Sequence, residues 1–170
     1  MLAKTEGVVK KPFPREIRPM LATLTHDYFF KSDWIYERKF DGERCFAMKD
    51  GNRVMLRSRN NNPIDVSYPE IQNAVEKLTN VHQVILDGEV VAFDGDTTSF
   101  ERLQSRMHVL KLTGRTYKVY YYIFDILYVD GYDITRVPLI GRKHILEALF
   151  NFKNPLQFTE YKFKGDLAYF

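Results

Sequence analysis

The sequence contains a single cysteine, Cys45, among its 170 residues. One cysteine cannot form an internal disulfide framework, and it cannot supply a zinc site built from several thiolates. The sequence also lacks an apolar run long enough to cross a bilayer and the N-terminal pattern of a signal peptide. These absences favour a soluble protein of a reducing compartment.

Neither sign of charge dominates, because 25 Lys and Arg residues stand against 22 Asp and Glu residues, for a net charge of +3. Such a balance tolerates a polyanionic partner without requiring one. Basic residues nevertheless crowd residues 1–18, which also hold two prolines, Pro12 and Pro14. We expect an extended basic lead-in there, and both a solvated tail and a nucleic-acid-binding arm remain open.

Length and composition predict one domain with a substantial core, since 45% of the residues are apolar and 15% are aromatic. Several short segments have strand composition and are separated by Asp-Gly turns, which favours antiparallel hairpins. The predicted strands are 34–40, 45–48, 54–56, 84–93 and 117–129.

Residues 67–78 carry the clearest helical pattern. Ser67 and Glu70 have the spacing of a capping box, and apolar residues follow at i, i+3, i+4 and i+7. Thr98 and Glu101 predict a second, short capped helix through Met107. A third helix is expected at 138–150, with Ile145, Leu146, Leu149 and Phe150 as its buried stripe. Helices interrupting hairpin-connected strands indicate an α+β fold with antiparallel sheets and not a doubly wound parallel one.

Lys39 lies between Glu37 and an Asp-Gly turn at 41–42. Alternation along a strand puts Glu37 and Lys39 on one face. A lysine becomes a nucleophile only after deprotonation, and because its unperturbed pKa is about 10.4, burial or nearby cations must lower that pKa. Arg38, Arg44 and a bound metal ion are candidate cations. On this segment alone, an ordinary Glu/Lys ladder on a surface strand is the simpler interpretation.

Asp87 and Glu89 project from one side of an otherwise apolar strand, with Gly88 between them. Buried carboxylates are costly unless a cation or hydrogen-bond donors meet them. Mg²⁺ takes hard oxygen ligands, so a metal-assisted phosphate site would explain the pair. Pairing with arginines explains it about as well. The glycine allows another group to approach the backbone closely.

Two further features have both a functional and a simpler explanation. Phe124 belongs to an aromatic segment that is most simply a core strand, although such a ring can stack on a purine. Arg57 and Arg59 alternate along one side of the hairpin strand that begins at Val54. Their guanidinium groups suit phosphate oxygens, but most such arginines merely remain solvated.

Taken in order, these segments resemble the ATP-dependent DNA ligases, within the superfamily that includes RNA ligases and mRNA capping enzymes. Lys39 to Arg44 reads K-F-D-G-E-R and matches the first motif of the family, K-x-D-G-x-R. The later motifs are similar to L-R-S-R at 56–59 with Y-P-E at 68–70, L-D-G-E at 86–89 and F-D at 124–125. The resemblance covers residues 19–170 and is closest to the ligase domain of bacterial ligase D and its archaeal relatives.

The resemblance implies a nucleotidyltransferase fold of the ligase and capping-enzyme type, related to ATP-grasp proteins. It also implies that Lys39 attacks ATP and carries AMP, with Mg²⁺ or Mn²⁺ as the metal. Glu37 would help to define the adenine pocket, Phe124 would stack on the base, and Glu89 would contact the ribose and the metal ion. Arg44 and Arg59 would hold ribose or phosphate oxygens. Asp41 and Asp87 would be structural, orienting the loop and its arginines.

Nicked duplex DNA is the partner that the resemblance implies, together with other end-joining or repair domains, in a prokaryotic cytoplasm without membrane contact. Ligases continue with an E-G-hydrophobic-x-x-K segment, a lysine pair and an OB-fold domain, and the sequence shows none of these. We therefore expect residues 19–170 to be a partial adenylation domain that is weak or inactive alone. An RNA ligase or capping-type guanylyltransferase, and a non-catalytic nucleotide- or nucleic-acid-binding module, remain as alternatives.

Overall fold

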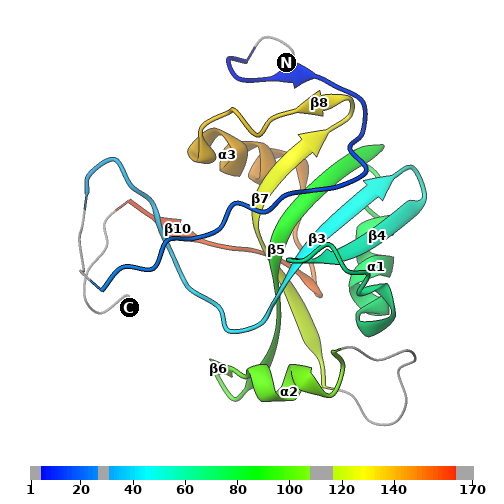
Figure 1. Ribbon diagram of the computed structural model, residues 1–170, viewed down its shortest axis with the longest axis vertical. Coiled ribbons are helices and arrows are strands. Elements are labelled where there is room, and N and C mark those ends of the chain that lie inside the picture. The colour runs from blue at the N-terminus through cyan, green and yellow to red at the C-terminus, as the bar shows by residue number, and fades with distance from the viewer. Residues whose placement is uncertain (1–4, 27–30, 108–116, 164–170) are drawn as a thin grey trace.

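The computed structural model describes residues 5–26, 31–107 and 117–163, and a twisted sheet forms its centre (Figure 1). The main path of the sheet has the order β1-β8-β7-β5-β3-β4, with β6 paired to β5 and β9 paired to β7. A separate two-stranded sheet joins β10 to β2. All these pairs are antiparallel except β7–β9, so the predicted α+β class is confirmed.

The strands of the sheets differ widely in length. Their bounds are β1 Val9–Lys10, β2 Tyr36–Glu37, β3 Glu43–Asp50, β4 Arg53–Ser58, β5 Gln83–Asp94, β6 Thr97–Thr98, β7 Val119–Val129, β8 Tyr132–Asp133, β9 Leu156–Phe158 and β10 Tyr161–Lys162. Three α-helices accompany them: α1 Pro69–Glu76, α2 Phe100–Gln104 and α3 Leu139–Leu149. A 3₁₀ turn, Asp65–Ser67, precedes α1.

The predicted central strands are confirmed as β3, β4, β5 and β7. The hairpin turn that follows Asp50 is confirmed as well, because Asp50 pairs with Arg53 across β3 and β4. The predicted strand at 34–40 is confirmed only at Tyr36–Glu37, which pair with β10, and is wrong for the residues on either side. The two strands nearest the end of the described chain separate, because β9 joins β7 whereas β10 joins β2.

The three predicted helices are confirmed, but neither predicted cap forms. Tyr68 occupies the N-cap position of α1 and Ser99 that of α2, and neither makes a side-chain cap hydrogen bond. Glu70 instead receives two hydrogen bonds from the guanidinium of Arg106, which is almost fully buried. Thr98 lies in β6 and not at the helix start. A carboxylate engaged by a tertiary partner is no longer available to close a capping box.

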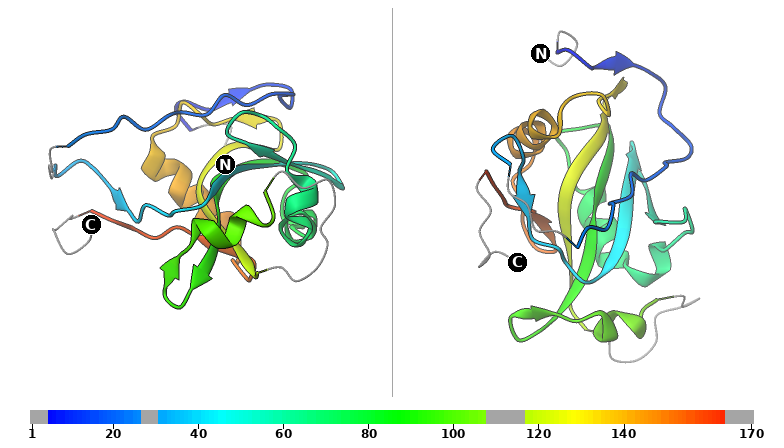
Figure 2. Two further views of the ribbon diagram at one scale, coloured as in Figure 1. Left: turned by 60° about the horizontal axis from the view of Figure 1, so that its bottom comes forward. Right: turned by 60° about the vertical axis from the view of Figure 1, so that its left-hand side comes forward.

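The two faces of the sheet have different neighbours, as alternation along each strand requires. Cys45, Ala47 and Leu86 point into the main core, where they share a cluster with residues of α1 and α3. Met48 and Ile85 point the other way and pack with Phe13 and Ile17 of the N-terminal segment. Figures 1 and 2 show this segment crossing the sheet on the side opposite the helices.

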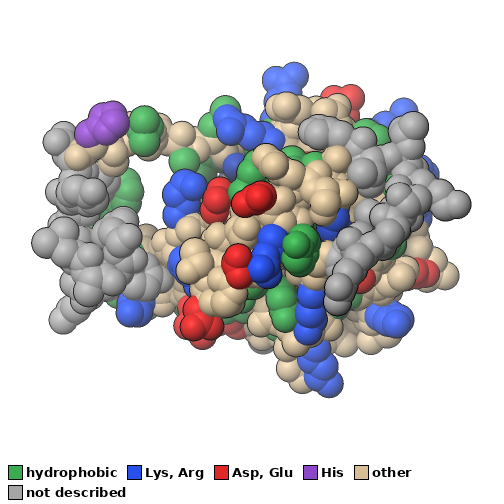
Figure 3. Space-filling view, turned by 90° about the horizontal axis from the view of Figure 1, so that it is seen from below, with side chains coloured by type: hydrophobic (Ala, Val, Ile, Leu, Met, Phe, Trp, Pro, Cys, Tyr) green, Lys and Arg blue, Asp and Glu red, His purple; other side chains and the backbone are tan. Residues whose placement is uncertain are grey.

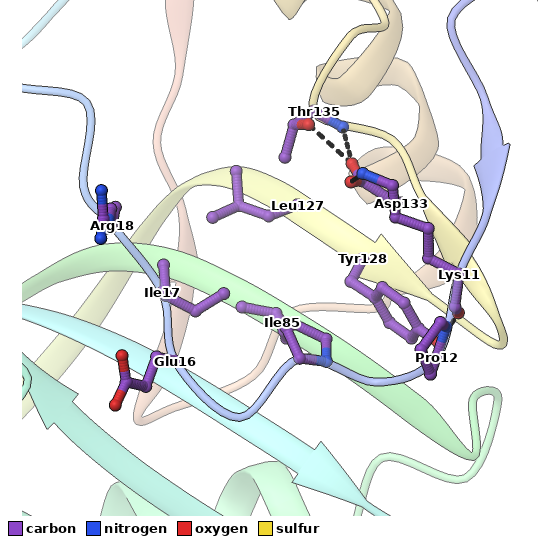
Figure 4. A pocket seen from close by; sticks show the side chains of 11 residues that line it. Lys11, Pro12, Glu16, Ile17, Arg18, Ile85, Leu127, Tyr128, Asp133 and Thr135 are labelled. Carbon is purple, nitrogen blue, oxygen red and sulfur yellow. Dashed lines mark hydrogen bonds and ion pairs between the residues drawn. The ribbon is translucent and has the colours of Figure 1, made fainter.

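The N-terminal segment is bound to the sheet from residue 9 onward, so a freely solvated tail is the wrong interpretation for this part. β1 pairs with β8, and Lys11 forms an ion pair of 2.6 Å with Asp133. Phe13 packs edge-on against Tyr128, with ring centroids 5.3 Å apart. A cavity of about 210 Å³ remains between the segment and the sheet (Figure 4).

Gly88 lies where the neighbouring strand β7 comes unusually close to β5, beside a shift in their pairing register, which confirms that a glycine there permits a close approach. A Cβ atom at this position would lie 2.4 Å from the Tyr122 carbonyl oxygen and 2.6 Å from the Tyr121 ring. Gly88→Ala is therefore expected to lower the free energy of unfolding, measured by urea denaturation, by about 3 kcal/mol. The backbone of β7 at Tyr122 cannot shift to make room without disturbing its pairing with β5.

Gly95→Ala is the matched control for that substitution. Gly95 has φ +57°, but no atom lies within 4 Å of the position that a Cβ atom would take, so only backbone strain opposes alanine there. That strain is worth about 1 kcal/mol. Equal losses of stability in the two variants would contradict the crowding inferred at Gly88.

Candidate functional site

A pocket of about 500 Å³ opens on the face of the sheet opposite the helices. Its lining includes five of the residues that the sequence singled out: Lys39, Arg44, Arg59, Glu89 and Phe124. Arg44 alternates with the core residue Cys45, and Glu89 alternates with the core residue Val90, which explains why both side chains reach this face.

Lys39 lies in the segment that joins β2 to β3, here called the Lys39 segment (residues 38–42). Its side chain is exposed at the pocket and makes no hydrogen bond or ion pair with the described residues, although it interacts electrostatically with Glu89. The end of the segment is pressed onto β5, because a Cβ atom on Gly42 would lie 2.1 Å from the carbonyl oxygen of Val90. The segment is therefore packed closely against the sheet, while the Lys39 amine remains available to a ligand.

Glu37 does not share the pocket with Lys39, because β2 ends at Glu37 and strand alternation does not continue to residue 39. Its carboxylate forms an ion pair with Lys143 of α3, whose side chain is fully buried. Burial raises the pKa of Glu37, while the neighbouring ammonium lowers it. Burial lowers the pKa of Lys143 in turn. Glu37 thus lies beside the pocket, two residues before the amine.

Arg44 is fixed in the pocket by three hydrogen bonds to two residues. Its Nε and one terminal nitrogen donate to the two oxygens of Asp87, at 3.0 and 2.7 Å, and its other terminal nitrogen donates to the Met20 carbonyl at 2.8 Å. The guanidinium also lies over the rings of Phe46 and Phe124, 5.2 and 5.5 Å from their centroids. A two-point bond of this kind sets the direction of the guanidinium as well as its place.

Glu89 is the carboxylate of the pocket that lacks a hydrogen-bond or ion-pair partner among the described residues. Burial raises its pKa to about 7, although Arg44 and Lys39 both lower it. Burial also raises the pKa of Asp87 to about 6 against the effect of Arg44. Asp87 therefore follows the arginine-pairing interpretation, whereas Glu89 keeps its oxygens available for a ligand.

Arg57 in β4 and Arg59 in the loop that follows it have different surroundings. Arg57 lies 3.4 Å from Asp65 and does not line the pocket. Arg59 is exposed at the pocket and has no ion-pair partner in the described part of the chain. Phe124 is half-buried, with its ring at the pocket and its neighbour Asp125 turned toward Arg142 of α3.

The donor set of the pocket suits a metal ion that is held partly by its substrate. No group of three or more His, Cys, Asp or Glu side chains that could hold a metal occurs in residues 5–26, 31–107 and 117–163. Mg²⁺ commonly binds through one or two carboxylates together with substrate phosphates and water. Glu89 offers one such carboxylate, so the residues present would suit a metal ion that also binds substrate phosphates, and not one held by protein ligands alone.

The cavity beneath the N-terminal segment is a weaker candidate. Its floor is apolar, with Ile85, Leu127 and Tyr128, and the Asp133 carboxylate at its rim is already engaged by Lys11 and Thr135 (Figure 4). Elsewhere, the face seen in Figure 3 intersperses Lys and Arg with Asp and Glu and shows no broad patch of one sign. No helix in the described part of the chain is long and apolar enough to span a membrane.

Comparison with known proteins agrees with this geometry. Residues 19–168 match the family model described as ATP dependent DNA ligase domain. The chain belongs to the ATP-dependent DNA ligase family. It is 36% identical over 137 residues to the multifunctional non-homologous end joining DNA repair protein LigD of Mycobacterium tuberculosis, covering 79% of this chain and 17% of that protein.

This ligase-family chain is also similar to an archaeal DNA ligase and to a solved structure of a mycobacterial ligase. It is 34% identical over 137 residues to a DNA ligase of Pyrobaculum arsenaticum, covering 78% of this chain and 24% of that ligase. It superposes on a structure of mycobacterial DNA ligase D complexed with ATP and MES with a TM-score of 0.62 and 31% identity, over 75% of this chain and 39% of the other. The chain thus spans about a sixth to a quarter of the curated relatives that it matches.

Several residues in and beside the pocket have no strong signal in the sequence. Leu21, Ala22 and Met107 line the pocket, and only their place in segments similar to ligase sequences could have indicated them. Lys143 was not predicted at all, because a lysine on a helix is ordinarily a solvated residue. Its partner Glu37 is 106 residues away in the sequence.

Glu89 gives the site a testable pH dependence. Because its pKa is raised from 4.5 to about 7 in the folded chain, its ionisation opposes folding, and its contribution to stability is lost as pH rises through this window. Glu89→Gln cannot ionise. We expect it to exceed the wild type in free energy of unfolding by on the order of 2 kcal/mol near pH 8 and to equal it near pH 4. A difference in urea denaturation that stays constant between these pH values would contradict the assignment.

Proposed function

We propose that this chain is an adenylation domain of an ATP-dependent DNA ligase and carries AMP on Lys39. One observation supports the proposal above all others: the unpaired amine of Lys39 shares a pocket with the guanidinium groups of Arg44 and Arg59, the unpaired carboxylate of Glu89 and the ring of Phe124. These groups suit the parts of a nucleoside triphosphate, namely its phosphates, its ribose or metal, and its base. We take residue 19 as the start of this domain, with residues 1–18 as its lead-in.

In the proposed reaction, the Lys39 amine loses its proton and attacks the α-phosphorus of ATP. A nitrogen–phosphorus bond forms while the bond from that phosphorus to the bridging oxygen breaks, and pyrophosphate leaves with the electron pair. Such a displacement asks little covalent chemistry of the protein, so catalysis rests on positioning the amine and neutralising phosphate charge. Arg44 and Arg59 both line the pocket and would contribute that charge.

The remaining roles follow from which groups are unpaired. Phe124 offers a half-buried ring for the adenine, and Glu89 offers a carboxylate for the ribose and for Mg²⁺ or Mn²⁺. When bound, the metal would screen the phosphates and favour departure of pyrophosphate. Glu37 would act from beside the pocket, and Asp87 would act through Arg44 by holding its guanidinium. Asp41 would help to shape the turn of the Lys39 segment.

The acceptor in this proposal is nicked duplex DNA. AMP passes to the 5′-phosphate at the nick as the nitrogen–phosphorus bond breaks, and the adjoining 3′-hydroxyl then displaces AMP to join the strands. The names of the mycobacterial relatives support an end-joining or repair context. Accompanying repair domains and a prokaryotic cytoplasm are part of the same proposal. RNA ends remain the competing acceptor.

Intact-mass measurement after incubation with Mg²⁺ and ATP tests the first step. We expect an acid-labile adduct with the mass of one AMP, formed slowly by this chain alone. Lys39→Ala should abolish the adduct, because no other nucleophile in the pocket is an amine. Lys118→Ala is the matched control, because Lys118 is also an exposed lysine but lies outside the pocket. The Lys118→Ala variant should still form the adduct.

Parallel incubation with GTP separates the alternatives. A GMP adduct in place of AMP would support a capping-type guanylyltransferase. Absence of any adduct, with retained binding of nucleotide or nucleic acid, would support a non-catalytic module and contradict the proposal. An AMP adduct that survives Lys39→Ala would contradict the assigned nucleophile.

A further inference from the structure

The Lys39 segment has no strand partner of its own, because β2 ends at residue 37 and β3 begins at residue 43. Arg38, Lys39 and Asp41 are exposed. A reactive amine on such a segment would sample many positions unless both ends of the segment were held. The structure provides a contact at each end, and each contact comes from a residue outside the pocket.

The first contact holds the residue before the segment. Lys143 of α3 is fully buried, and its ammonium forms an ion pair with the Glu37 carboxylate. The same nitrogen lies 3.3 Å from the Thr159 carbonyl oxygen and near the rings of Phe158 and Tyr161, at 5.2 and 5.7 Å from their centroids. An ammonium that is buried away from water is stable only with such partners. The position of Glu37 is therefore tied to α3 and to the strands β9 and β10.

The second contact holds the turn at the other end. The backbone N–H of Asp41 donates to the hydroxyl of Thr98 in β6 at 3.3 Å. β6 is itself fixed, because it pairs with β5 and because Arg102 bonds the Phe93 carbonyl and Asp94, at 2.6 and 2.7 Å. The turn therefore rests on a rigid hairpin.

We propose that Lys143 and Thr98 are positioning residues, which hold the two ends of the Lys39 segment so that its amine faces the pocket. The inference rests on the proposed function, in which Lys39 is the nucleophile. Neither residue touches the pocket, so both act through the backbone of the segment. A displacement of about 1 Å at a reacting group can cost on the order of 10² in rate, so loss of either contact should show in the chemical step.

Single-turnover adenylation of the 170-residue chain, followed by intact mass over a range of ATP concentrations, tests this. Lys143→Met and Thr98→Val should lower the rate at saturating ATP by about 10- to 100-fold, with the half-saturating ATP concentration unchanged. Lys143→Arg and Thr98→Ser keep a donor cation and a hydroxyl, respectively, and should restore part of the rate. Acetylation of Lys39 by a small reagent, measured on peptides, should stay at the wild-type level because it requires no alignment with a bound nucleotide.

Lys49→Met is the matched control for a buried lysine. Lys49 is 4% exposed, its ammonium donates to the Glu76 carbonyl at 2.7 Å, and it lies outside the pocket. This variant should lose stability while keeping its adenylation rate. If Lys143→Met loses no more rate than Lys49→Met, and Thr98→Val loses none, the inference is overturned while the proposed function stands. If the wild type forms no adduct, the proposed function fails first and this inference falls with it.

Discussion

The ion pair between Arg44 and Asp87 is the interaction on which the pocket depends. It joins β3 to β5 on the pocket face, and the remaining guanidinium nitrogen extends the link to the Met20 carbonyl beside the pocket wall. Burial alone would make the Asp87 carboxylate costly, and the two-point bond offsets that cost while fixing the arginine between two aromatic rings. Asp87 is thereby occupied, which leaves Glu89 as the carboxylate available to a nucleotide or its metal.

Much of the fold follows from local patterns in the sequence. The strands β3, β5 and β7 and the helices α1 and α3 have strong periodicity or clear turns, so their prediction needed no tertiary information. The site was a different case. Lys39, Glu89 and Phe124 each had a simple structural explanation when taken alone. In the sequence, only the order of the family motifs connected them, and the structure then shows all three lining one pocket.

The features that could not be predicted depend on partners distant in the sequence. Glu70 was assigned to a capping box, yet it binds the buried Arg106, which lies 36 residues away. Glu37 was placed beside Lys39 by strand alternation, yet it binds Lys143 at a separation of 106 residues. Buried cations such as Arg106 and Lys143, and two-residue strands such as β2, leave little trace in local composition, because only the folded chain shows which residues they contact.

The most direct test of Lys39 as the nucleophile is a crystal structure of the chain after incubation with ATP and Mg²⁺. We expect density continuous from the Lys39 amine to a phosphorus atom of AMP, with the base against Phe124 and Arg44 still bound to Asp87. A nucleotide seated in the cavity beneath the N-terminal segment, or a base turned away from Phe124 with Lys39 unmodified, would contradict that assignment.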